Sequence, residues 1–138
     1  MKTELLQNVK AQPYTSAAAI DRKGFNSAVL AVLVGTPTGS PTALTLGLTF
    51  TECDTDSGVF TAVKDKAILV EKALLDSNGA ISFDTDAEGG DMFNFDIDLS
   101  GCKRYVKITI AITCTGGTSP TCSTTNAIVL GDSIEQPV

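Results

Sequence analysis

The chain has 138 residues and a formal net charge of −6, with 43% hydrophobic and 19% charged residues. This length and balance fit one globular domain, and the acidic charge argues against a basic surface that binds nucleic acid. The sequence contains no histidine, the commonest general base and metal ligand, and no apolar run as long as the roughly 20 residues of a membrane helix. We therefore expect a protein that is not an enzyme, holds no cofactor or metal, and binds neither nucleic acid nor membrane.

The first 16 residues show no period typical of a strand. "MKTELLQNVKAQPYTS" mixes charged, polar and apolar residues without alternation, as terminal arms commonly do. We expect an extended N-terminal arm over residues 1–16 and a single β-domain over residues 17–138. The last residues, "SIEQPV", have a similar character.

The first two strands of the expected domain have different patterns. The stretch 25–35, "FNSAVLAVLVG", is apolar on both faces from Ala28 to Val34. This favours a central strand covered on both sides, or one whose outer face meets a partner. The stretch 43–52 alternates instead, which predicts a half-buried strand with four inward residues: Leu44, Leu46, Leu48 and Phe50.

The second half of the chain predicts further strands. Alternation over 93–99 turns Phe93, Phe95, Ile97 and Leu99 inward, and alternation over 105–114 turns Val106, Ile108, Ile110, Ile112 and Cys114 inward. A last apolar strand is expected at 125–131, and weaker strands at 58–63 and 80–83.

The segment 64–77, "KDKAILVEKALLDS", is compatible with two structures. Its Ala, Leu, Glu and Lys residues permit a short helix, whereas Ile68, Leu69 and Val70 also permit a strand. Turns rich in Gly, Pro, Asn and Asp separate the other strands. About seven short strands joined in this way predict an all-β, single-domain antiparallel β-sandwich or a small jelly-roll-like barrel.

The four cysteines are Cys53, Cys102, Cys114 and Cys122, and none has the C-x-x-C spacing of zinc or redox sites. One reading is free, partly buried thiols. The other is a disulfide, for which Cys114 and Cys122 are the first candidates because they flank the loop "TGGTSPT".

The stretch "DTDAEGGD" begins like a calcium-binding loop, with oxygens at Asp84, Asp86 and Glu88. The twelfth position of such a loop is Phe95, where a bidentate Glu is required. A looser site with Asp84, Asp86 and Asp91 is the remaining alternative. We favour a solvated acidic turn.

Three of the 10 Lys and Arg residues gather at "GCKRYVKITI", namely Lys103, Arg104 and Lys107. One interpretation is a solvated strand start that neutralises Asp96 and Asp98, and such surface pairs contribute little energy. The other is a partner interface that faces an acidic surface on a neighbouring subunit, where complementary charge sets orientation.

Three stretches in this order resemble one family of proteins: "AIDRKGFNSAVLAVLVG" (19–35), "LTFTECDTDSGVFTAV" (48–63), and "GCKRYVKITIAIT" (101–113) followed by "AIVLGDSIEQPV" (127–138). The family is that of the head decoration, or cement, proteins of tailed bacteriophages, encoded near the major capsid protein. The resemblance implies a structural virion protein without enzymatic activity. It would be made in the host cytoplasm, form a homo-oligomer such as a dimer or trimer, and bind the major capsid protein on the capsid surface to stabilise adjacent subunits.

Two other functions remain open at this point. A head–tail joining or tail accessory protein would also belong to the virion. A non-catalytic β-sandwich that binds carbohydrate is a different class, but the chain has no Trp and only two Tyr, and aromatic platforms are what such sites commonly use.

Overall fold

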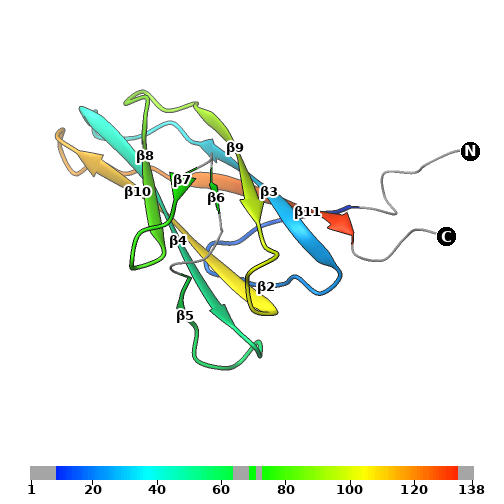
Figure 1. Cartoon of the computed structure of the whole chain (residues 1–138). Coiled ribbons are helices and arrows are strands. Elements are labelled where there is room, and N and C mark those ends of the chain that lie inside the picture. Colours follow the sequence, from blue (N-terminus) through cyan, green and yellow to red (C-terminus); the bar gives the residue numbers. More distant parts are fainter. Residues whose placement is uncertain (1–8, 64–68, 71–72, 134–138) are drawn as a thin grey trace, which may run out of the picture.

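The computed structural model describes residues 9–63, 69–70 and 73–133, and every strand pairing in this part is antiparallel. The strands form two sheets that face each other (Figure 1). Sheet A has the order β1-β11-β3-β9-β6-β7, and sheet B has the order β2-β10-β4-β5, with β8 also paired to β4. The strands are β1 (Lys10–Pro13), β2 (Ala19–Asp21), β3 (Phe25–Val34), β4 (Ala43–Cys53), β5 (Thr61–Ala62), β6 (Leu69–Val70), β7 (Ala73–Leu74), β8 (Ala80–Thr85), β9 (Met92–Asp98), β10 (Tyr105–Thr115) and β11 (Thr124–Ser133).

The predicted β-sandwich is confirmed, and its period-two strands lie as the sequence indicates. Along β4 the side chains alternate between buried and half-buried positions, and the same alternation runs along the first half of β10. The part of the chain that the structure describes contains no helix that is long and apolar enough to cross a membrane.

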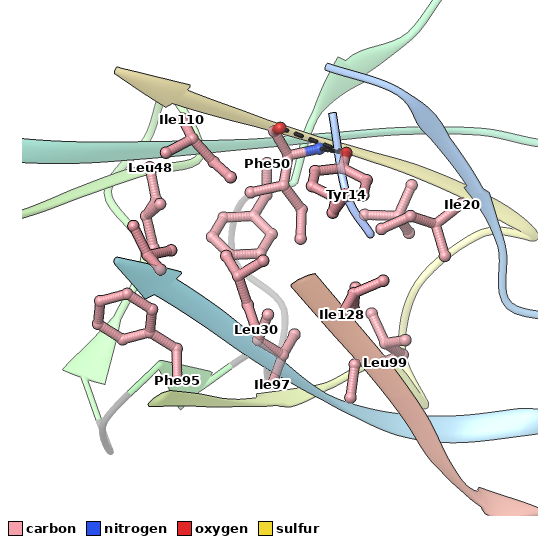
Figure 2. Close-up of a cluster of buried hydrophobic side chains, with 14 of the residues drawn as sticks. Tyr14, Ile20, Leu30, Leu48, Phe50, Phe95, Ile97, Leu99, Ile110 and Ile128 are labelled. Carbon is pink, nitrogen blue, oxygen red and sulfur yellow. Dashed lines mark hydrogen bonds between the residues drawn. The ribbon is translucent and has the colours of Figure 1, made fainter. Parts of the chain in front are cut away.

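The core fills the space between the two sheets (Figure 2). Residues from β4 and β10 face residues from β3, β9 and β11, and most of them are almost completely buried. Three stacked rings extend the core toward one end: the centroids of Phe83 and Phe95 are 4.8 Å apart, and those of Phe93 and Phe95 are 5.4 Å apart. Stacked aromatic pairs of this kind add stabilisation beyond the area they bury.

The N-terminal arm predicted for residues 1–16 differs from the structure where it is described. Lys10–Pro13 form β1, which pairs with β11 at the edge of sheet A. Tyr14 follows and is 6% exposed, inside the core (Figure 2). β1 is too short to show alternation, and its partner strand lies more than 100 residues away in the sequence. The local sequence pattern therefore does not reveal this strand. Residues 1–8 of the predicted arm lie outside the described residues.

Residues 14–18 cross from sheet A to sheet B and cover the edge of β10. The Tyr14 hydroxyl donates to the carbonyl of Ala18 (2.6 Å) and accepts from the N–H of Ile108 (3.0 Å). The Ser16 hydroxyl accepts from the N–H of Ile110 (2.8 Å). Side-chain hydroxyls therefore satisfy backbone groups that a neighbouring strand would otherwise bond.

The ambiguous segment 64–77 contributes strands where the structure describes it. Leu69–Val70 and Ala73–Leu74 form the short pair β6 and β7, and Val70 pairs with Ile97 of β9. Residues 64–68 and 71–72, where a helix was also considered, lie outside the described residues.

Candidate interaction surfaces

The predicted basic cluster lies at one end of the sandwich, where β10 begins beside β2. The Arg104 guanidinium binds the Asp21 carboxylate through two contacts, Nε to Oδ1 at 3.1 Å and Nη2 to Oδ2 at 2.9 Å. Both side chains are nearly half exposed, and the Arg104 guanidinium lies 5.1 Å from the centroid of the Tyr105 ring. The hydrogen bond from Arg104 lowers the pKa of the Asp21 carboxyl, and the same contact raises the pKa of Arg104.

The loop before β10 is held in place by Arg22, a residue that the sequence did not single out. Its Nε donates to the carbonyls of Cys102 (2.9 Å) and Lys103 (3.1 Å), and its Nη1 donates to the carbonyl of Phe25 (3.4 Å). The five donors of a guanidinium suit this role. The signal in the sequence was the "AIDRKG" stretch, in which Asp21 and Arg22 both contact the loop.

A buried carboxylate also binds the backbone of the same loop. Glu52, at the end of β4, is 3% exposed, and its Oε2 accepts the backbone N–H of Lys103 at 3.0 Å. It continues the inward positions of the β4 alternation, where an acidic residue is unusual because a buried charge requires compensating partners. The sequence did contain a signal for this buried carboxylate, because Glu52 occupies an inward position of the alternation along β4.

The three predicted cations therefore have three different environments. Arg104 is bound to Asp21, whereas the Lys107 ammonium lies 4.1 Å from the centroid of the Phe60 ring. Lys103 is exposed, and its backbone is fixed from both sides. The pairing expected with Asp96 and Asp98 is wrong for Arg104, because those carboxylates lie on β9 in the other sheet, where Asp98 accepts hydrogen bonds from Ser100.

Cations gather at one end of the sandwich, beside the carboxylates of Asp21, Asp54 and Asp56, and both Asp21 and Asp56 act electrostatically on Arg104. Among the described residues, five of the six cations lie at the end with the basic cluster: Arg22, Lys23, Lys103, Arg104 and Lys107. The opposite end carries the acidic loop 84–91 (Figure 1). Asp91 accepts the N–H of Asp86 (2.8 Å), and Asp86 accepts the N–H of Glu88 (2.9 Å), so these carboxylates cap their own turn. No group of three metal-binding side chains occurs in the described part of the chain.

The outer faces of the two sheets differ in composition. On sheet B half of the outward residues of β4 and β10 are threonines, namely Thr45, Thr49, Thr51, Thr109, Thr113 and Thr115. On sheet A the outward residues of β3 include Ser27, Val29, Ala31 and Leu33, and Leu33 is 41% exposed. The exposure of Leu33 argues against a strand that is covered on both sides along its whole length, and the other reading, an outer face that meets a partner, stays a prediction.

Two of the shallow surface hollows are lined by residues that the structure describes. One, of about 450 Å³, is lined by Pro13, Tyr14, Thr15, Ser16, Thr124, Thr125 and Asn126, and the other, of about 490 Å³, by Thr36, Pro37, Gly39, Ser40, Pro41, Ala87 and Glu88. Tyr14 is the single aromatic residue in these linings, and its ring is buried. Neither hollow presents an aromatic platform for a sugar ring.

The structure shows no disulfide among the four cysteines, all of which lie in its described part. Cys102 is buried at 5% exposure, and the other three are half-buried. The Cys122 thiol donates to the carbonyl of Gly35 (3.4 Å), and Cys114 lies on β10 in sheet B. Hydrogen bonding, chiefly from the Thr55 backbone, lowers the pKa of the Cys53 thiol.

No protein-family model matches the chain, and no curated protein is significantly similar to it. Among solved structures, the chain is similar to the SPBc2 prophage-derived protein YomS, with a TM-score of 0.44 and 17% sequence identity. That match covers 90% of this chain and 94% of the other.

Proposed function

We propose that this chain is a structural virion protein that decorates a phage head, binding its outside and stabilising adjacent capsid subunits. The family resemblance of the three sequence stretches suggests the role. The observation that carries it is the rigidly held loop with Lys103 and Arg104 at the start of β10. A clamp between subunits gains affinity when its contacts are fixed before binding, and the loop from Cys102 to Arg104 is fixed by Arg22, Glu52 and Asp21.

Within this end, Lys103 and Lys107 are the cations that meet the partner. The Asp21 carboxylate already neutralises Arg104, so Arg104 contributes little net attraction. Lys103 is exposed on a fixed loop, and Lys107 is half-buried over the Phe60 ring. The partner surface is acidic and belongs to a capsid subunit. Complementary charge at such a rim chiefly accelerates and orients binding.

The first test is quantitative mass spectrometry of purified particles. A decoration protein that follows an icosahedral lattice is present in hundreds of copies, whereas a head–tail joining protein forms one ring of about a dozen. A count in the hundreds supports the proposal. A ring-sized count would replace it with the joining or tail role, and absence from particles would refute both.

The second test removes the two lysine charges. Binding of the Lys103→Gln/Lys107→Gln variant to particles that lack the protein should weaken roughly tenfold and become less dependent on salt. A matched control, Thr36→Glu/Thr118→Glu, makes the same change in net charge in exposed loops at the opposite end and should bind normally. Equal weakening in both variants would show that net charge, and not this surface, controls binding.

A further inference from the structure

The edge of β10 that faces away from β4 is closed over only part of its length. Along a strand the backbone groups of alternate residues point to the same side. At this edge the N–H and C=O groups of Ile108 and Ile110 are bound by the hydroxyls of Tyr14 and Ser16. The two hydroxyls therefore take the place of a neighbouring strand, but only as far as Ile110.

The next residues of the same edge, Ile112 and Cys114, lack this cover. β10 pairs with β4 without interruption up to Thr115, so the N–H and C=O groups of Ile112 and Cys114 point to the same side as those of Ile110. Within the described part of the chain no hydrogen bond reaches these groups. The side chains show the same boundary, because Ile110 is 8% exposed whereas Ile112 and Cys114 are half-buried.

The open stretch also lacks the features that keep strand edges from pairing. Edge strands are commonly protected by charged residues, by proline or by a covering segment. Three other edges of the described sheets contain such residues: Lys10 and Pro13 on β1, Asp21 on β2, and Asp84 on β8. Residues 111–115, by contrast, are Ala, Ile, Thr, Cys and Thr. An open edge of this kind is a template for another strand.

We infer that this edge pairs with the same edge of a second copy, in antiparallel register, about a two-fold axis that passes beside Thr113 at right angles to sheet B. Ile112 of each copy then lies opposite Cys114 of the other, and each of these pairs exchanges N–H···O bonds in both directions. Thr113 lies opposite Thr113 of the second copy, in the non-hydrogen-bonded position between the two pairs. The inference stands whether or not the chain decorates a capsid.

The side chains favour a second copy over an unrelated strand. On the inner face, half-buried Ile112 would pack against Cys114 of the other copy, and this contact forms twice, as in an isologous interface. On the outer face two Thr113 hydroxyls would meet, a cross-strand pair that stabilises neighbouring strands. The open stretch ends at Ser16 on one side and at Gly116, with a φ of +78°, on the other, so a stretch of the same length fits it.

The paired stretch is short, and this sets the strength of the contact. It covers three residues per copy, from Ile112 to Cys114, whereas a standard stable interface contains about 20–30 residues on each side. The dimer is therefore weak and should form only at high protein concentration.

Disulfide trapping tests the register. Residues opposite each other in a non-hydrogen-bonded pair have Cα atoms about 4.5 Å apart, a distance that a disulfide can span. Thr113→Cys should therefore form covalent dimers severalfold faster under mild oxidation than the wild type with its native cysteines. The matched control Thr109→Cys lies on the same face of the same strand, beside the part of the edge that Tyr14 covers, and should remain at the wild-type rate. Equal cross-linking of the two variants would overturn the inference.

Hydrogen exchange of the intact protein tests the pairing without new cysteines. The amides of Ile112 and Cys114 should exchange more slowly as the protein concentration rises to about 1 mM. Thr113→Asp places two like charges opposite each other at the axis and should abolish this protection, whereas Thr109→Asp should keep it. Exchange that does not depend on concentration would overturn the inference.

The same experiment on particles separates the possible occupants of the edge. Protection that appears only on particles, in a protein that stays monomeric in solution, would show that a strand of another protein covers the edge, and would also overturn the inference. Particle copy number, measured separately, distinguishes failure of this contact from failure of the capsid role.

Discussion

The Tyr14 hydroxyl joins the two sheets, and its removal should destabilise the fold measurably. In Tyr14→Phe the ring remains in the core, but the N–H of Ile108 and the carbonyl of Ala18 lose their partner. A buried backbone group without a partner costs about 1–3 kcal/mol. We expect a loss of about 2 kcal/mol in the free energy of unfolding, or a decrease of about 4–8 °C in Tm for a domain of this size.

The assay is urea unfolding at pH 8, in parallel with Tyr105→Phe. Tyr105 is the other tyrosine of the chain, and its half-buried ring lies on the outer face of sheet B. This control should change the free energy of unfolding by less than about 0.5 kcal/mol. Equal stability of Tyr14→Phe and wild type would refute the assigned role of the hydroxyl.

The pH dependence gives an independent check of Tyr14. Burial raises the pKa of its phenol in the folded state above the ordinary value of 10.0. The neutral phenol therefore contributes stability that is fully present below about pH 10 and is lost as the pH rises through the folded pKa. The difference between wild type and Tyr14→Phe should be constant up to about pH 10 and shrink above it. A difference that grows with pH would contradict this reasoning.

Three further predictions concern single residues. Gly79 has a φ of +76°, and a Cβ there would meet the carbonyl oxygens of Phe50 and Val63. Gly79→Ala should therefore lower the free energy of unfolding, measured by urea titration, by more than about 1 kcal/mol. An unchanged midpoint of the urea transition would contradict this. Arg104 lowers the pKa of Asp21, so the stabilisation from this ion pair is present above about pH 4 and is lost as the pH falls through the pKa of Asp21 in the folded state. Asp21→Asn should therefore lower the free energy of unfolding by less than about 1 kcal/mol at pH 7 and by a smaller amount at pH 3. Urea unfolding at both pH values measures the difference. In thiol titration of the native protein Cys53 should react first, because its pKa is lowered, and buried Cys102 last. A total that reductant raises from two to four thiols would instead show one disulfide, for which Cys114–Cys122 is the predicted pair.

The fold class was predictable because three of its longer strands alternate between buried and exposed residues along the sequence. The inward residues of β4, β9 and β10 alternate in the sequence as they do in the structure. Strands β1 and β2 are too short to show a period. Their positions depend on pairing with β11 and β10, far along the chain, and a local pattern contains no information about such partners.

The candidate site was predictable in its location but not in its contacts. The concentration of cations before β10 is visible in the sequence, whereas the choice of Asp21 over Asp96 as partner follows from the assignment of β2 and β9 to different sheets. The buried carboxylate of Glu52 and the three carbonyl contacts of Arg22 likewise depend on the closed loop before β10. The role of Lys103, Arg104 and Lys107 at a partner interface stays a prediction.

The pairing of the first described strand with the last one has a consequence for synthesis. β1 leaves the ribosome early, but its partner β11 emerges only after almost the whole described chain has been made. Until then β3 also lacks its β11 neighbour, so β1 and one edge of β3 stay unpaired while the preceding chain is made. Native structure should therefore form only once β11 has emerged, with the long delay typical of non-local β pairing. A stalled or truncated chain that lacks β11 would present the unpaired edge of β3 and the inner face of sheet B, which makes it a target for chaperones and proteases.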